Sequence, residues 1–350
     1  MTLTAPPSWI SFDDLPHAHG GPIVTGRMRE RPEDFRVDEI PICEPDGEGE
    51  HLLLRVRKTG ANTEWVARRL ASHAGLPVSK VGFAGLKDRH AVTSQWFTLH
   101  AGVHLNPDWS TLDTEGVEVL EVHRHGRKLR RGGLRGNRFR IRIRDLKGDT
   151  GLLEERIEQA RRLGVPNYFG VQRFGNREGN LYAATALFAG EAKRVPRHKR
   201  GLWLSAARSQ LFNQVLAMRV ERGDWDRPLD GERMQLDRSR ASFLAEPIDE
   251  ELTERCRVFD VHPSGPLWGA GEKLTRGDVA ALEQRALEGF PLWTAGLADA
   301  GLRQERRPLR LCVAAMDGVV AEDRLEIRFE LPAGAYATAV LRELVDWRQF

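Results

Sequence analysis

The chain has 350 residues, with 53 Lys plus Arg against 50 Asp plus Glu and a formal net charge of +3. Its 41% hydrophobic and 29% charged residues exclude a mostly disordered or fibrous protein, and a chain of this length folds without disulfides or metal. No apolar run reaches the ~18–20 residues that span a bilayer, the first residues lack a secretory signal pattern, and the three cysteines show no C-x-x-C spacing. We therefore expect a cytoplasmic protein and, without coiled-coil heptads, a monomer.

The first 150 residues are dominated by strand-like runs. These lie at 51–58, 80–85, 94–100, 117–123 and 138–144. A helix is expected between the first two, because Asn62 or Thr63 can cap its start and Gly75 can end it.

The rest of the chain alternates helical and strand patterns. Helices are expected at 149–163, 205–222, 275–287 and 338–347, and a strand at 324–331 is followed by a turn at 332–336. The Gly-, Asn- and aromatic-rich stretch 165–180 reads as a loop, and it is long enough to suggest a functional role. The predicted fold class is α+β (mixed α/β), with a core that the end of the chain completes.

The near-neutral average hides a strongly basic segment. Residues 123–147 contain eleven Lys or Arg and one Asp, a balance of +10, so the other residues sum to −7. Within this segment Arg138, Arg140, Arg142 and Arg144 alternate with apolar residues, which places the four guanidinium groups on one face of a strand. We call these four residues the arginine strand and expect it to contact nucleic-acid phosphates, since a guanidinium binds phosphate in a bidentate way.

A second chemically informative stretch surrounds Asp88. A strand runs into Gly85 and a polar turn, where Asp88 lies between Lys87 and Arg89. The two cations are expected to favour the ionised carboxylate and to extend the basic surface. Such an anion suits nucleophilic or general-base work on a phosphate-bearing substrate, although a Lys-Asp-Arg turn on its own is more often a solvated surface turn.

Several motifs carry a family resemblance. They are GFAGLKDRHAVTSQW (82–96), VPNYFGVQRFGN (165–176), WLSAARSQLFN (203–213) and LPAGAYAT (331–338), with the shorter PEDF (32–35) and EPDGEGEH (44–51). Together, and in this order, they closely resemble the TruD family of tRNA pseudouridine synthases across almost the whole chain.

The resemblance implies a pseudouridine synthase catalytic core with a mixed sheet, formed by residues 1–162 and 311–350, and an inserted family-specific α/β domain at 163–310. It implies isomerisation of uridine 13 in the D-arm of tRNA to pseudouridine, without metal or organic cofactor, with Asp88 as the essential aspartate. It places Phe35, Asn137 and Tyr336 in the uridine pocket. Tyr336 departs from the family's usual phenylalanine, so its hydroxyl adds a hydrogen-bonding group.

Physical chemistry agrees with these roles. The uridine must leave the base stack before its C1′–N1 bond can break. Asp88 supplies a carboxylate that either attacks the sugar or removes a proton from it. Phe35 and Tyr336 supply apolar walls, and the Asn137 amide reads the uracil edge.

Other readings are weaker. The His-x-His pairs lack further ligands at zinc spacing: His17 with His19, and His123 with His125. Neither a phosphate-binding G-x-x-x-x-G-K-[ST] loop nor a G-x-S-x-G hydrolase elbow occurs. The remaining alternative is a non-catalytic tRNA- or structured-RNA-binding protein.

Overall fold

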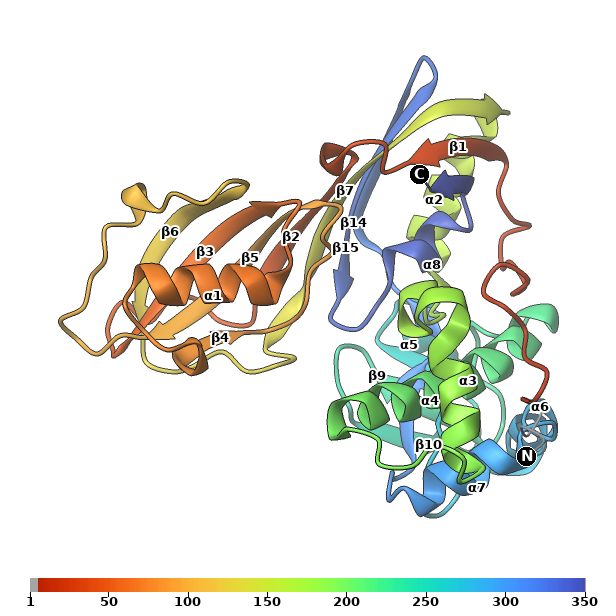
Figure 1. Ribbon diagram of the computed structural model, residues 1–350. Coiled ribbons are helices and arrows are strands. Elements are labelled where there is room, and N and C mark those ends of the chain that lie inside the picture. The colour runs from red at the N-terminus through yellow and green to blue at the C-terminus, as the bar shows by residue number, and fades with distance from the viewer. Residues whose placement is uncertain (1–5, 350) are drawn as a thin grey trace. The chain divides into compact units, whose positions relative to one another are not determined.

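A computed structural model describes residues 6–349 of the chain, which divide into two units (Figure 1). The first unit contains Met1–Gly21, Glu158–Cys312 and Ala335–Leu344, and the second contains Pro22–Ile157, Val313–Gly334 and Val345–Phe350. The expected insertion at 163–310 falls within the first unit.

The segments Met1–Gly21 and Ala335–Leu344, which the sequence analysis assigns to the catalytic core, also belong to the first unit. Contacts within that unit explain this grouping. The backbone N–H groups of Ala18 and His19 both donate to Glu343 Oε2 at 3.1 Å, and the His19 ring lies 2.8 Å from the Gly164 carbonyl oxygen.

The second unit is built on one mixed sheet, as its alternating sequence patterns predict. Its strands are β1 (Val24–Met28), β2 (Phe35–Pro41), β3 (His51–Thr59), β4 (Val81–Phe83), β5 (Val92–His100), β6 (Val117–His125), β7 (Leu134–Gly148), β14 (Ala314–Ala321), β15 (Arg324–Pro332) and β16 (Val345–Gln349). The main order is β14-β15-β7-β2-β5-β3-β6, β1 pairs with β7 and β16, and β4 pairs with β5. The pairs β2–β5 and β1–β16 are parallel and the others antiparallel.

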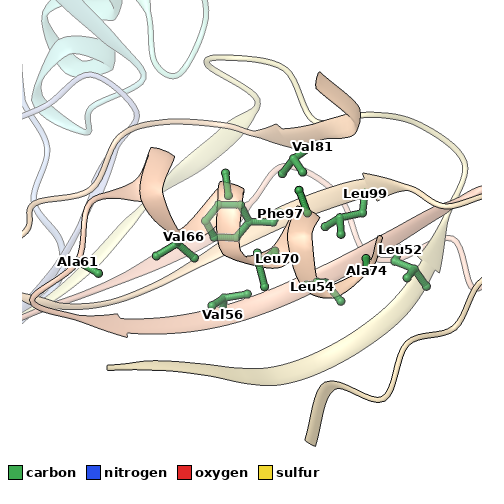
Figure 2. Packing of buried hydrophobic residues seen from close by; sticks show 12 residues of the cluster. Leu52, Leu54, Val56, Ala61, Val66, Leu70, Ala74, Val81, Phe97 and Leu99 are labelled. Atoms are coloured by element: carbon green, nitrogen blue, oxygen red, sulfur yellow. The ribbon is translucent and has the colours of Figure 1, made fainter. Parts of the chain in front are cut away.

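Helix α1 (Thr63–His73) covers one face of this sheet. Its Val66 and Leu70 are fully buried against Leu54, Val56 and Phe97 from the strands, and Figure 2 shows this cluster. The helix predicted between Asn62 and Gly75 is thereby confirmed, and Gly75 adopts φ +66, a conformation that favours glycine after a helix. This packing fixes the turn between β4 and β5, which follows α1 in the chain.

The first unit mixes helices with two small sheets. Its helices are α3 (Gly179–Phe188), α4 (Arg197–Glu221), α5 (Glu250–Arg257), α6 (Gly277–Ala286), α7 (Pro291–Asp299) and α8 (Ala337–Leu341), while α2 (Gly151–Leu163) crosses the boundary between the units. One sheet has the order β10 (Ser242–Ala245), β9 (Glu232–Leu236), β11 (Val261–Leu267), β12 (Glu305–Pro308), and the other pairs β13 (Arg310–Leu311) with β8 (Val165–Pro166).

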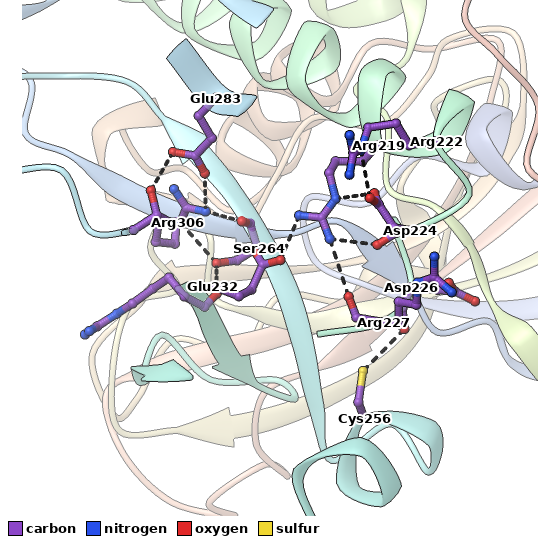
Figure 3. A network of polar contacts seen from close by, with 12 residues as sticks. Arg219, Arg222, Asp224, Asp226, Arg227, Glu232, Cys256, Ser264, Glu283 and Arg306 are labelled. Atoms are coloured by element: carbon purple, nitrogen blue, oxygen red, sulfur yellow. Dashed lines mark hydrogen bonds and ion pairs between the residues drawn. The ribbon is translucent and has the colours of Figure 1, made fainter. Parts of the chain in front are cut away.

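A buried ion network lies between α4 and β9 (Figure 3). Arg219, with a side chain 1% exposed, donates to Asp224 Oδ1 at 2.6 Å and to Glu232 Oε2 at 2.7 Å. The two carboxylates compensate a cation that burial would otherwise make very costly.

The structure corrects two element predictions. The helix expected at 338–347 is wrong, because only Ala337–Leu341 is helical and Val345–Gln349 forms β16. Parallel pairing of this segment with β1 overrides its local helical pattern. The helix expected to start at 205 begins at Arg197. Among the described residues, no helix is both long and apolar enough to cross a membrane.

Candidate active site

The turn between β4 and β5 carries Asp88, and side chains from α1 and β5 form hydrogen bonds with the backbone of this turn. Thr63 Oγ1, in the first turn of α1, accepts from the Lys87 backbone N–H at 2.9 Å. Gln95 from β5 donates to the Gly85 carbonyl oxygen at 3.2 Å. The turn is therefore anchored to a rigid helix and strand, which suits a side chain that must be placed accurately.

The Asp88 carboxylate is paired with a cation that the sequence analysis did not identify. Arg29 Nη1 lies 2.7 Å from Asp88 Oδ2, and Oδ1 accepts from the His90 backbone N–H at 3.0 Å. The expected neighbours point elsewhere: Arg89 donates to the Gly60 carbonyl oxygen, and Lys87 contacts other groups. Arg29 thus replaces them as the ion-pair partner of Asp88.

Arg29 follows β1 directly and adopts φ +64, a left-handed conformation that is uncommon for arginine. Its guanidinium group lies 4.1 Å from the centre of the Phe35 ring. The Phe35 ring is 5% exposed and packs edge-on against Phe139. In this arrangement Phe35 supports the cation that holds Asp88.

Lys58, also absent from the sequence-based site, is fully buried beneath the same turn. Its Nζ donates to the carbonyl oxygens of Ala61 at 2.8 Å and Asp88 at 2.7 Å, with a longer contact to that of Lys87 at 3.4 Å. Burial lowers the pKa of the Lys58 ammonium to about 8, although nearby Asp88 opposes the change. Lys58 is therefore a strut for the backbone of Asp88.

Lys87 is largely buried rather than part of an exposed basic surface. Its Nζ lies 2.8 Å from Glu39 Oε2 and donates to Asn137 Oδ1 at 2.8 Å. The lysine side chain is 7% exposed and that of Glu39 1%. The structure thus brings Asn137 into contact with a residue of the Asp88 turn.

Tyr336 belongs to the first unit, at the residue before α8. Its half-buried ring lies 5.9 Å from that of Phe169, whose face is covered by Arg307 at 4.1 Å. Burial lowers the pKa of Arg307 to about 10. A Cβ atom at Gly170 would lie 2.5 Å from Thr338 Oγ1 and 3.1 Å from Tyr336 Cδ1, so any larger residue would force these side chains to shift.

The arginine strand lies on β7 with alternate side chains outward, as the period of two predicts, but carboxylates neutralise it. Arg138 pairs with Glu330 at 2.6 Å and Arg140 with Glu326 at 2.9 Å, both from β15. Asp34 pairs with Arg144 at 2.7 Å. The hydrogen bonds that Glu326 accepts, the largest from Arg328, lower its pKa to about 2, so this face carries anions among its cations.

The remaining part of the basic segment forms an exposed loop at residues 126–133, which we call the basic loop. The Gly132 N–H donates to the Ala84 carbonyl oxygen at 2.7 Å, so the basic loop lies beside the start of the Asp88 turn. Arg127 and Arg130 line a cavity of about 430 Å³ and form no ion pair within residues 6–349. Unlike the arginine strand, these two cations remain available to an anionic ligand.

Of the two residues that sequence analysis did not identify, only Lys58 had a signal in the sequence. Lys58 follows Leu52, Leu54 and Val56 at a spacing of two, which puts it on the buried face of β3. A lysine on a buried face is rare unless its charge is compensated. Nothing local marked Arg29, because its ion pair depends on the tertiary arrangement of β1 and the β4–β5 turn.

Comparison with known proteins gives consistent matches. The chain matches the family model described as tRNA pseudouridine synthase D (TruD) at residues 17–194 and 180–344. It is 49% identical over 346 residues to the tRNA pseudouridine synthase D of Methylococcus capsulatus, covering 99% of this chain and 98% of the relative. Identity to that of Xanthomonas campestris pv. campestris (strain B100) is 50% over 347 residues, covering 95% and 94%.

A crystal structure from Methanosarcina mazei, described as a putative tRNA pseudouridine synthase D, has a TM-score of 0.72 to this chain. It is 20% identical and covers 94% of this chain and 95% of its own. At this identity the match shows a shared fold.

Proposed function

Because the chain belongs to the TruD family and is a tRNA pseudouridine synthase, we propose that it isomerises uridine 13 in the D-arm of tRNA, with Asp88 as the essential carboxylate. The observation that carries this proposal is the Arg29–Asp88 ion pair, in a turn whose backbone is hydrogen-bonded to the Lys58 and Thr63 side chains. An aspartate fixed in this way is pre-organised for chemistry rather than left as a solvated turn residue.

In the proposed reaction the C1′–N1 bond of the uridine breaks, the uracil turns, and a new bond joins C1′ to C5. C5 then loses its proton to solvent and N1 takes up a proton from solvent, so the product is an isomer of the substrate. Asp88 either adds to the sugar or takes a proton from it, and Arg29 stabilises its anionic form before and after that step. Following the family resemblance, we assign Phe35, Asn137 and Tyr336 to the uridine pocket. Stacking, worth about 1–3 kcal/mol, is assigned to the half-buried Tyr336 ring, because the Phe35 ring is buried and covered by Arg29. No metal or organic cofactor takes part in this proposal.

We assign tRNA phosphate binding to both parts of the basic segment, with the basic loop as the stronger contributor. The arginine strand must exchange its carboxylate partners for phosphates, whereas Arg127 and Arg130 need no such exchange. Changing Arg127 and Arg130 to Ala should reduce the slope of log affinity against log salt by about 1 per lost contact. The matched change of Arg138 and Arg140 to Ala should reduce it less. Equal slopes for both pairs would contradict this ranking.

The test of the function is Asp88→Asn, which removes the anion and keeps the shape. Tritium release from tRNA containing [5-³H]uridine should be lost, while tRNA affinity by filter binding stays within about tenfold because phosphate contacts dominate it. Replacing uridine 13 of the tRNA by cytidine should abolish release by the unmodified enzyme. Release by Asp88→Asn at the normal rate would refute the role of Asp88.

A matched control is Asp113→Asn, the same substitution at an exposed loop residue that forms no ion pair in the described chain. It should release tritium normally. A non-catalytic RNA-binding protein, the alternative function, would bind tRNA equally well in all three forms and release no tritium in any of them.

The free thiols of Cys43, Cys256 and Cys312 fit a reducing compartment, and we place the enzyme in the cytoplasm as a monomer.

A further inference from the structure

The contact between Lys87 and Asn137 fixes which end of the asparagine amide faces outward. Lys87 Nζ lies 2.8 Å from the Asn137 amide oxygen. An ammonium group carries only donors, so the atom that faces it must be the acceptor oxygen. The reversed amide would place its NH2 group against the ammonium, and that orientation is therefore disfavoured.

The ammonium is itself held by a buried anion. Glu39 Oε2 lies 2.8 Å from Lys87 Nζ, and Glu39 Oε1 accepts from the Trp96 backbone N–H at 3.3 Å. Glu39 and Asn137 are also directly paired across β2 and β7. With side chains 1% and 7% exposed, Glu39 and Lys87 are shielded from water, which strengthens their attraction.

The consequence is an asparagine with its NH2 group presented away from Lys87. Within the described residues no protein group accepts a hydrogen bond from that NH2, although Asn137 is only partly exposed. Asn137 contacts Lys87, which lies in the same turn as Asp88, and the family resemblance assigns Asn137 to the uridine pocket, so we take the NH2 group to face the uridine. A ligand atom that meets it must be an acceptor.

Uracil and cytosine differ at position 4, where uracil carries an acceptor oxygen and cytosine a donor amino group. We propose that Lys87 and Glu39 are positioning residues that lock Asn137 as a donor to uracil O4, so that the enzyme accepts uridine and rejects cytidine. This inference rests on the proposed function. It assigns a specificity role to two buried residues that touch Asn137 or each other and not the base.

The test replaces O4 by sulfur, a weaker acceptor. Single-turnover rates are measured on tRNA with uridine, 4-thiouridine or 2-thiouridine at the target position. For the unmodified enzyme we expect 4-thiouridine to react about tenfold more slowly than uridine, and 2-thiouridine to react within about twofold. In Lys87→Met and Asn137→Asp the rate on 4-thiouridine should come within about twofold of the rate on uridine. Lys87→Arg, which keeps a charged donor, should retain part of the difference between the two substrates.

A second measurement does not depend on activity or on one variant. In the Asp88→Asn background, Kd is compared for tRNAs with uridine or cytidine at the target position. The unmodified Lys87 should favour uridine by about tenfold, and Lys87→Met or Asn137→Asp should remove the preference. Asn137→Asp keeps a partner for Lys87 and so tests the idea even if Lys87→Met misfolds.

An unchanged 4-thio penalty or an unchanged uridine preference in these variants overturns the proposal, as does an unmodified enzyme indifferent to 4-thiouridine. Failure of the proposed function would look different, because the unmodified enzyme would then form no pseudouridine at position 13 of ordinary tRNA.

Discussion

Replacing Lys58 by Met separates the support of the Asp88 turn from the stability of the fold. The change leaves the carbonyl groups of Ala61 and Asp88 without their charged donor, at a cost of about 1–3 kcal/mol each. It also removes a buried cation. The fall of the Lys58 pKa from 10.5 to about 8 corresponds to a free-energy cost of roughly 3 kcal/mol for burying this charge in the folded protein.

These two effects oppose each other, so the free energy of unfolding at pH 7 should change by less than about 3 kcal/mol. The backbone of Asp88, by contrast, loses the hydrogen bond from Lys58 that holds its carbonyl group in place. We expect kcat to fall by about 10- to 100-fold, because a misplaced catalytic group costs rate even when binding is intact, and tRNA affinity to stay within about twofold. Urea unfolding measures the free energy of unfolding, multiple-turnover tritium release measures kcat, and filter binding measures tRNA affinity. Hydrogen exchange of residues 84–91 reports whether the backbone of the Asp88 turn has loosened.

The pH dependence supplies a sharper check. The folded-state pKa of Lys58, about 8, lies below the unfolded value of 10.5, so between these pH values the unfolded chain binds more protons and stability rises with pH. Lys58→Met lacks this rise, and the stability difference should shift in favour of the unmodified enzyme by up to about 3 kcal/mol between pH 8 and 10.5. Lys147→Met, at an exposed position of β7, is the control and should follow the unmodified enzyme. Parallel pH profiles for Lys58→Met, or a normal kcat, would refute the reasoning.

Two other substitutions probe ion pairs of different kinds. Arg29→Met should lower kcat by about 10- to 100-fold, since the partner of the Asp88 carboxylate is only 14% exposed, and Arg29→Lys should recover part of the loss; equal rates for both variants in tritium release would contradict this. Arg219→Met should lower the free energy of unfolding by about 3–5 kcal/mol, because the Asp224 and Glu232 carboxylates stay buried without a cation. Chemical denaturation measures this loss, and a cost below about 1 kcal/mol would show that the network is not buried in solution.

Periodicity predicted those elements whose pattern and packing agree. The alternation at 138–144 lies in β7, and the capped pattern after Asn62 is α1, because in both cases the apolar face that the sequence displays is the one that is buried. The pattern at 338–347 failed because the partner of β16 is β1, from the start of the chain. Such long-range pairing leaves no local trace.

The candidate site divides in the same way. Asp88 stands within a motif long enough to identify, and Asn137 joins its network through Lys87. The prediction that Lys87 and Arg89 pair with Asp88 was wrong, because adjacent residues in a tight turn point in different directions. The observed partner, Arg29, follows β1 and is distant in sequence. Sequence did not show that the arginine strand is paired with carboxylates, because Glu326 and Glu330 are brought opposite it only by the β15–β7 register.

The pairing of β1 with β16 has a consequence for biosynthesis. Arg29 follows β1, so the strand that delivers it to Asp88 is flanked by a segment made long after it. While the ribosome adds the residues in between, β1 has β7 on one side and an open edge on the other. Contacts between segments so distant in sequence form slowly, and an exposed edge in the meantime invites mispairing. The nascent chain is therefore expected to become active only after Val345–Gln349 docks, which makes completion of this edge a late step in the maturation of the enzyme.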